Sequence, residues 1–310
     1  MSYADHVFIK NCQDILKNGE MTPCRAKWKD GTQASTLRIF GVVNRYNLAE
    51  EFPIMTLRKT NLTNAIDELL WIWQKKSNNI NELHSHIWDS WANKDGSIGK
   101  AYGYQIGQRY VHHVIDNCRK IPDSDIGIFT RKNDYPSAKP IKDKKCPWKV
   151  NIWMDQIDSV LYDLKNNPTS RRIMTNIYNF KDLRDMGLYP CAYSMTFNVM
   201  NGKLNAILNQ RSQDVLTANN WNVVQYAILM HMIAIHVGLE VGELIHVIGD
   251  MHIYDRHIED VKALIEREPK PAPKLIINNA IHNFYEFRTS DFTLENYEYH
   301  PNIGKIEVAI

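Results

Sequence analysis

The chain has 310 residues, of which 44% are hydrophobic and 23% charged, and its formal net charge at pH 7 is +2. These values are typical of a globular protein with a large core, and so small a charge excludes a strongly basic nucleic-acid or membrane-surface protein. The first residues lack the basic start and apolar run of a signal peptide, and no apolar run reaches about eighteen residues, so we expect neither a signal peptide nor a membrane span. Five cysteines at irregular spacing fit neither a disulfide framework nor a zinc site, so we expect a cytoplasmic protein.

The first half of the chain contains a predicted strand and two predicted helices. Residues 36–45 are β-rich around Gly41, which indicates a strand with a bulge or bend. Apolar residues at helical spacing predict helices over residues 62–75 and 151–166. Asn167-Pro168 ends the second of these helices.

The second half predicts a hairpin, a buried helix and two short strands. Residues 194–208 have strand character, with a tight turn at Asn201-Gly202. Residues 223–237 are apolar nearly all round, which predicts a buried helix that Gly238 caps. Residues 275–277 and 306–308 read as further strands. The pattern predicts one α+β domain over residues 1–310.

Residues 117–149 form a predicted insertion loop. They contain four prolines and a basic run over residues 139–145. The run suits phosphate or nucleic acid, but no aromatic interleaving accompanies the lysines, which favours a solvated loop. RNA binding through this insertion stays open as an additional role.

Cys191 is the first candidate for chemistry, because Arg211 follows about twenty residues later and a guanidinium stabilises a thiolate. Adjacent arginines at 171 and 172, together with Arg25 and Arg211, suit a phosphate dianion. Glu68 interrupts an apolar helix, where a carboxylate is costly to bury unless it is used for acid–base work.

Several segments then carry a resemblance to a family. In chain order they are FPIMTLRK, ELLWIWQKKSN, IWDSWA, GKAYG, NPTSRR, LYPC, QRSQD, WNVVQYAILMHMIA, GDMHIYDRH, REPKPAP and the terminal VAI. In order and spacing the chain resembles thymidylate synthase from about residue 21 to residue 310, broken mainly by the insertion. The resemblance implies a single α+β domain in which helices pack on a large mixed β-sheet, and a homodimer formed through that sheet.

The resemblance also implies a reaction, the transfer and reduction of a one-carbon unit from 5,10-methylenetetrahydrofolate to C5 of dUMP. Cys191 would be the nucleophile at C6 of the uracil ring, because C5 is a poor nucleophile until a thiolate adds at C6. Glu68 would relay protons, Tyr102 would assist loss of the C5 proton, and Arg211 would lower the pKa of the thiol.

The binding residues follow from the same resemblance, and no metal is expected. The nucleotide side would comprise Arg25, Arg171, Arg172, Arg211, Ser212, Asn222, His252 and Tyr254, with Arg171 and Arg172 donated across the dimer interface. The folate side would comprise Trp88, Trp91, Leu188, Asp214, Ala309 and Ile310, and the C-terminus would close over the ligands.

Asn222 is the position that would read the base. One carboxamide satisfies both the O4 acceptor and the N3–H donor of uracil, whereas cytosine inverts that pattern. An asparagine can flip, so this interpretation requires neighbouring groups to fix its orientation. Ala192, Ala218 and Asn61 depart from residues common in the family, and Ala192 removes a polar neighbour of the pyrimidine.

Two alternatives to the methylating enzyme stay open beside RNA binding. A dUMP or dCMP 5-hydroxymethylase would share the same residues and release tetrahydrofolate, although Trp88 and the VAI terminus favour methylation because they would shield the intermediate from water. A metal site at His252–His257 or at His84 and His86 is the second, but both spacings are weak motifs.

Overall fold

A mixed six-stranded sheet organises the computed structural model, which describes residues 2–116, 126, 127, 129, 134–146, 148–304 and 306–310. In spatial order its strands are β1 (Glu20–Lys27), β2 (Gln33–Asn47), β9 (Glu240–Tyr254), β8 (Lys203–Asp214), β7 (Ala192–Met200) and β6 (Met174–Asn176). Only β8 and β9 run parallel, and the other neighbours are antiparallel. The predicted α+β class and large mixed sheet are confirmed.

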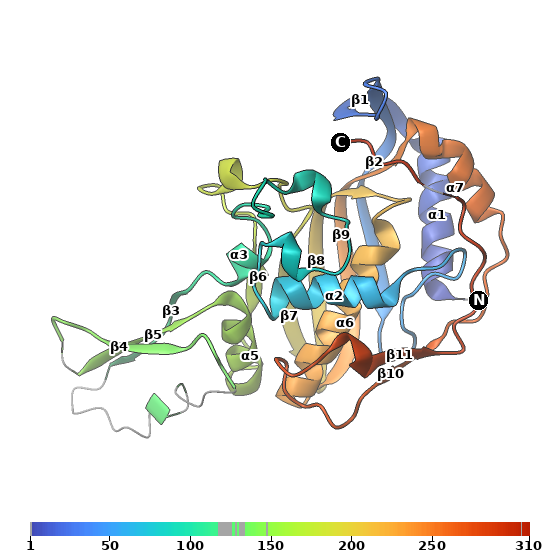
Figure 1. Ribbon diagram of the computed structural model, residues 1–310. Helices are drawn as coiled ribbons and strands as arrows, with labels where there is room; N and C mark the ends of the chain where they lie inside the picture. The colour runs from blue at the N-terminus through green and yellow to red at the C-terminus, as the bar shows by residue number, and fades with distance from the viewer. Residues whose placement is uncertain (1, 117–125, 128, 130–133, 147, 305) are drawn as a thin grey trace.

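Helices cover one face of this sheet, with α2 lying across α6 in front of the strands (Figure 1). The helices are α1 (Tyr3–Asn18), α2 (Leu62–Trp73), α3 (Gly103–Ile106), α5 (Gln156–Asn166), α6 (Asn219–Val237) and α7 (Ile258–Ile265). Helix α6 contacts β8, β9 and α2, so apolar residues all around it are buried as its sequence predicts. Gly238 ends it with a φ of +75°.

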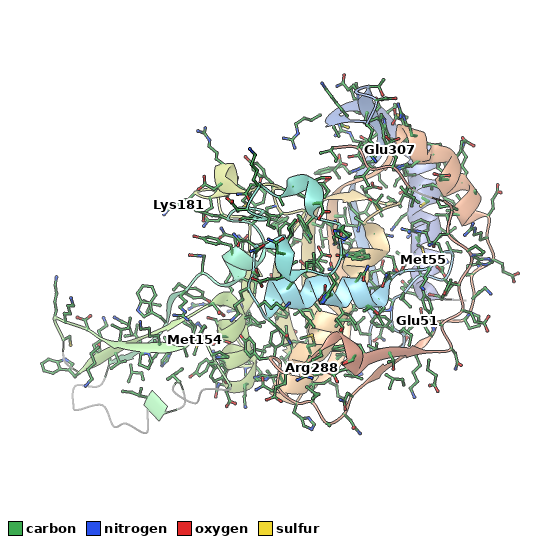
Figure 2. All side chains as sticks on the ribbon, viewed as in Figure 1. Glu51, Met55, Met154, Lys181, Arg288 and Glu307 are labelled. Atoms are coloured by element: carbon green, nitrogen blue, oxygen red, sulfur yellow. The ribbon has the colours of Figure 1, made fainter. Side chains whose placement is uncertain are left out.

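Two smaller sheets complete the fold. Strands β10 (Lys274–Ile277) and β11 (Phe292–Glu295) form a pair. Strands β3 (Tyr110–Asp116), β5 (Lys149–Met154) and β4 (Lys139–Lys142) form an arm that projects from the body (Figure 1). Met154, labelled where the arm joins the body in Figure 2, is fully buried.

The predicted helix over residues 151–166 is wrong in its first turn. Residues up to Met154 belong to β5, which pairs with β3 on one side and β4 on the other. Burial along β5 alternates with a period of two, and the helix starts only after Asp155, whose side chain accepts the backbone N–H of Asp158 at 3.0 Å. Trp153 therefore lies on a strand.

Three other predicted elements are confirmed, and one predicted strand is wrong. The helix over residues 62–75, the hairpin at Asn201-Gly202 and the strand over 275–277 are present. Residues 306–308 form no strand; instead Ile310 exchanges backbone hydrogen bonds with Lys27 at 2.8 and 2.9 Å. Strand β4 occupies part of the predicted insertion, 117–149, and the rest of that prediction falls partly outside the described residues.

Gly41, with a φ of +83°, marks the bend predicted in β2. Leu37, Ile39 and Val42 pack on the same core cluster, so the alternation of side chains slips by one residue around Gly41. The same change of alternation occurs in β9, where Ile248, Met251 and Ile253 pack on that cluster. Because both strands change at the same level, the pairing register between β2 and β9 is kept. At this level β9 also lies close to β8, because a Cβ added to Gly249 of β9 would come 3.0 Å from the carbonyl oxygen of Arg211 on β8.

Candidate active site

A cavity of about 60 Å³ brings several predicted residues together. It lies where α2, α6 and the start of β7 meet, and segments distant in sequence contribute to its wall. The predicted residues that line it are Glu68, Trp88, Tyr102, Cys191 and Asn222, and their neighbours are Leu69, Ile72, Trp73, Ala192, Gln225 and Tyr226.

Cys191 stands immediately before β7, and Arg211 on β8 holds it there. The Arg211 guanidinium donates to the carbonyls of Pro190 and Tyr189 at 3.0 and 2.9 Å, and its Nη2 lies 3.8 Å from the Cys191 Sγ. The backbone N–H of Arg211 also donates to the Cys191 carbonyl at 2.9 Å. One arginine therefore positions the loop and places a positive charge beside the sulfur.

The thiol is not strongly acidic in this state of the protein. Burial raises the pKa of Cys191 above its ordinary value, and the positive charge of Arg211 lowers it only in part. The contribution predicted for Arg211 is present, but desolvation is the larger effect. At neutral pH the sulfur is therefore mostly protonated before a substrate arrives.

Glu68 lies on the buried face of α2 and accepts three hydrogen bonds. The indole N–H groups of Trp88 and Trp221 donate at 2.7 and 2.5 Å, and the Gln225 amide donates at 2.7 Å. Burial raises the pKa of Glu68, and these donors offset that rise in part. The sequence reasoning missed Trp221 and Gln225. Their spacing of four residues on α6, beside Asn222, is the signal that points to them.

Tyr102 adopts a backbone conformation that is unusual for a residue other than glycine, with a φ of +46°. Its hydroxyl accepts the backbone N–H of Cys191 at 3.4 Å, and its ring packs against the Trp88 ring with centroids 4.8 Å apart. Burial raises the pKa of the Tyr102 hydroxyl. Such strain costs about 1–3 kcal/mol and persists where the surroundings enforce it, as at functional sites.

The residues predicted for the ribose lie at the end of β9, alongside β8. The backbone pairs Ser212 with Asp250 and Asp214 with His252. His252 shares a hydrogen bond of 2.7 Å with Asp250, and its ring lies 5.4 Å from that of Tyr254. Burial raises the pKa of the Tyr254 hydroxyl above its ordinary value.

The four predicted phosphate arginines are not gathered at one point of this chain. Arg25 is exposed on β1, and Arg171 and Arg172 are exposed between α5 and β6. Among the described residues, only Arg211 of the four contacts Cys191. A shared phosphate site would therefore need either closure of the chain or a second copy of it.

Of the residues predicted to bind folate, Trp88 and Trp91 are neighbours. The Trp91 ring is 5.7 Å from that of Trp88. Asp214 is engaged in a turn, accepting the backbone N–H groups of Leu216 and Thr217 and, at 2.6 Å, the Thr217 hydroxyl. Its carboxylate thus has a structural role that the sequence did not reveal. Leu188 is exposed to an intermediate degree.

The C-terminus lies against β1. Ala309 is buried beside Trp28, and the terminal Ile310 pairs with Lys27. Glu307, labelled near β1 in Figure 2, accepts the backbone N–H of Lys29 at 3.2 Å. These contacts place the last residues next to the strand that carries Arg25.

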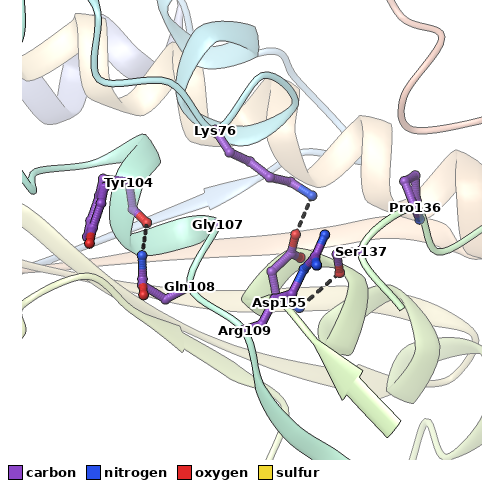
Figure 3. A pocket seen from close by; sticks show the side chains of 8 residues that line it. All are labelled: Lys76, Tyr104, Gly107, Gln108, Arg109, Pro136, Ser137 and Asp155. Atoms are coloured by element: carbon purple, nitrogen blue, oxygen red, sulfur yellow. Dashed lines mark hydrogen bonds and ion pairs between the residues drawn. The ribbon is translucent and has the colours of Figure 1, made fainter. Parts of the chain in front are cut away.

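A larger cavity of about 360 Å³ lies elsewhere, at the base of the arm (Figure 3). Lys76 forms an ion pair with Asp155 there, and the Asp155 backbone N–H donates to the Ser137 hydroxyl at 2.9 Å. These groups satisfy one another, and none is a predicted site residue.

The histidines of the weak metal motifs are engaged in other bonds. His84 contacts Asp67 and His86 contacts Asp89, each at 3.1 Å, and His257 Nε2 donates to the Glu307 carbonyl at 2.9 Å. In the described part of the chain, no group of three or more His, Cys, Asp or Glu residues is arranged to hold a metal ion. None of its helices combines the length and apolar character that crossing a membrane requires.

The fold and the cavity together define an α+β enzyme with a cysteine thiol at its cavity. The thymidylate synthase family model matches residues 6–310. The thymidylate synthases of Bacillus subtilis subsp. natto and Bacillus phage phi3T are each 39% identical over 317 aligned residues, covering both chains completely. The solved structure of thermostable thymidylate synthase A from Bacillus subtilis superposes with a TM-score of 0.81 at 38% identity, covering 99% of each chain. The chain belongs to the thymidylate synthase family.

Proposed function

We propose that this enzyme methylates dUMP to dTMP with 5,10-methylenetetrahydrofolate and releases dihydrofolate, in the cytoplasm. The observation that carries the proposal is the meeting of Cys191, Glu68 and Asn222 at one cavity of a chain that matches the family throughout. The folate cosubstrate supplies the one-carbon unit and the reducing hydride, and the residues of the chain supply the nucleophile, the proton transfers and the exclusion of water.

Cys191 begins the reaction by bonding to C6 of the uracil ring. As the S–C6 bond forms, the thiol loses its proton and the electron pair of the C5–C6 bond moves toward C5 and O4. Arg211 stabilises the sulfur as its proton leaves, because its guanidinium already lies 3.8 Å away. C5 becomes a carbon nucleophile that can attack the methylene group.

Glu68 and Tyr102 carry the protons of the later steps. The raised pKa of Glu68 lets its carboxyl hold a proton for O4 and take it back. Tyr102 contacts the Cys191 backbone, which supports its role in loss of the C5 proton. The three donors to Glu68 keep its carboxyl facing the cavity, where the uracil ring would lie.

The remaining side chains would hold the two substrates. Arg25, Arg211 and Ser212 bind the phosphate, His252 and Tyr254 bind the ribose, and Asn222 reads the pyrimidine edge. Trp88, Trp91, Leu188 and Asp214 bind the folate, while Ala309 and Ile310 close the site. Exclusion of water favours a methyl product, because water that trapped the methylene intermediate would give a hydroxymethyl group.

Thymidylate synthases are dimers, and we propose that Arg171 and Arg172 reach the phosphate of the partner chain. Their exposure supports this role. The sheet face opposite the helices exposes apolar side chains suited to an interface, namely Phe40, Val43, Met200 and Ile207.

Product identification tests the proposed activity. The protein is mixed with dUMP and methylenetetrahydrofolate, dihydrofolate is followed by absorbance, and the nucleotide is identified by mass spectrometry. We expect equal amounts of dihydrofolate and dTMP, with neither formed when dUMP is omitted. Tetrahydrofolate accompanied by a hydroxymethyl nucleotide would establish the hydroxymethylase alternative instead.

Mixing two inactive variants tests the shared site. Arg172→Ala lacks the donated arginine, and Cys191→Ser lacks the nucleophile. A mixed dimer would contain one complete site, so activity should return after subunit exchange. If the mixture stays inactive although mass spectrometry detects mixed dimers, the arginine is not donated across the interface.

A further inference from the structure

Gln210, on β8 behind the base-reading Asn222, has a carboxamide whose orientation is fixed by its neighbours. Its Nε2 lies 2.9 Å from the backbone carbonyl of Ser212 and 3.3 Å from the Asn222 Oδ1. A carbonyl oxygen can only accept a hydrogen bond, so the atom that faces Ser212 must be the NH₂ group. The Gln210 Oε1 therefore faces the other way, where it lies 2.9 Å from Nε2 of His246.

This orientation also determines which nitrogen of His246 carries hydrogen. The Gln210 oxygen needs a donor, so the His246 Nε2 must be the protonated nitrogen. His246 is fully buried on β9, and burial lowers its pKa to about 3, so the ring is neutral and Nδ1 is a bare acceptor. That Nδ1 has no hydrogen-bond partner among the described residues.

Asn44 stands directly opposite His246 on β2 and offers the complementary group. Its Oδ1 accepts from the Asn11 amide at 3.1 Å, while its Nδ2 donor has no partner among the residues described. An unpaired donor thus stands opposite an unpaired acceptor. The hydrogen bonds in this chain of groups share one direction: Asn11 donates to Asn44, His246 donates to Gln210, and Gln210 donates to Asn222 at the cavity.

The last group in this direction is Asn222. Because its Oδ1 accepts from Gln210, its NH₂ group and the second lone pair of Oδ1 remain for the cavity that it lines. An NH₂ donor beside a carbonyl acceptor matches O4 and N3–H of uracil. Reading cytosine would require Asn222 to flip, and its NH₂ would then meet the NH₂ of Gln210.

We propose that His246 is a specificity-determining positioning residue, which holds Gln210 so that Gln210 holds Asn222 in the orientation that reads uracil. The proposal rests on the proposed function. It also accounts for Ala192, which is buried directly opposite Gln210 in the β7–β8 pairing. Alanine brings no polar group to the pyrimidine side, so the orientation is imposed from behind the site, through the sheet.

Substitution of His246 tests the proposal through base selectivity, the ratio of kcat/KM for dUMP to that for dCMP. His246→Leu removes the donor, and His246→Gln restores an N–H three bonds beyond Cβ, as in histidine. We expect the leucine variant to lose about tenfold in this ratio, the size of one hydrogen bond, and the glutamine variant to regain most of it.

His231→Leu is the matched control, because His231 is another neutral histidine, on α6, whose Nε2 has no partner among the described residues. Its selectivity should equal that of the unmodified protein. An unchanged ratio in His246→Leu, or an equal loss in the His231 control, would overturn the proposal. Absence of dihydrofolate from dUMP in the unmodified protein would instead contradict the proposed function.

Nitrogen NMR of the unmodified protein supplies a test that does not depend on turnover. With the protein labelled at histidine nitrogens, we expect His246 at pH 6–8 to be a neutral ring with hydrogen on Nε2. The resonance is assigned by its loss in His246→Gln. A neutral ring with its hydrogen on Nδ1 would overturn the orientation of the whole chain of groups, because Nε2 could then not donate to Gln210.

Discussion

Two buried ionisable side chains form walls of the cavity, Cys191 on one wall and Glu68 on the other, and their neighbours differ. Burial raises the pKa of both groups. Beside Cys191 stands a guanidinium 3.8 Å from the sulfur, whereas Glu68 is surrounded by three neutral donors. A single charge favours the thiolate without enclosing it, and neutral donors fix a carboxyl that still holds protons. Under the proposed function, this difference suits a thiol that bonds to the substrate and a carboxyl that keeps its position while it transfers protons.

Cys191→Ser should have the largest effect, since it removes the proposed nucleophile. A serine hydroxyl has a far higher pKa than a thiol, and Arg211 cannot offset that difference. We expect turnover to fall by about 10⁴-fold or more, measured as dihydrofolate release. Calorimetry should show dUMP binding within a few-fold of the unmodified protein, and retained turnover would remove Cys191 from the mechanism.

Glu68→Gln changes the other wall and should have the next largest effect. The amide cannot transfer a proton and presents an NH₂ group to one of its three donors, so kcat should fall by about 10²- to 10⁴-fold. Asp67→Asn, one position earlier on α2, is the matched control, because Asp67 contacts His84 and not the cavity. Equal losses in both variants would mean that α2 is disturbed as a whole.

The sequence predicts those parts of the fold and the site that depend on local preferences or on the chemistry of single residues. The apolar spacing of α2 and α6 and the Asn201-Gly202 turn depend on local preferences, so those elements were predictable. Cys191 and Arg211 were linked by their chemistry and by the resemblance. Residues 151–154 were misread because Ile152 and Trp153 suit either a helix or a strand, and the partners β3 and β4 decide between them.

The donors around Glu68 and the support behind Asn222 depend on tertiary structure. Trp221 lies 153 positions from Glu68 in the chain, and His246 lies 36 positions from Gln210. No local pattern marks such pairs, because a buried tryptophan or histidine usually serves only to fill the core. The direction of each hydrogen bond can be stated only once both partners are placed.

The pH dependence of alkylation sharpens the comparison at the cysteine wall. Because the pKa of Cys191 is raised, the thiolate fraction should grow about tenfold per pH unit throughout the neutral range. Iodoacetamide labelling of Cys191, quantified by peptide mass spectrometry from pH 6 to 8.5, should follow that slope without a plateau. Arg211→Gln should slow labelling at each pH, since it removes the positive charge. A plateau below pH 8 would show that the arginine outweighs burial.

The pH dependence of stability tests the carboxylate wall and should give the smallest effect. Because the folded state raises the pKa of Glu68 above its ordinary value of 4.5, the folded protein binds the proton more tightly than the unfolded chain. The free energy of unfolding therefore loses a contribution as the pH rises from about 4.5 through the folded pKa, and that loss is complete above it. Urea unfolding of the unmodified protein and of Glu68→Gln, compared at several pH values from 4.5 upward, isolates this contribution. The difference between the two should shift in favour of the glutamine variant as the pH rises, and a constant difference would show that the three donors cancel the cost of burying the charge.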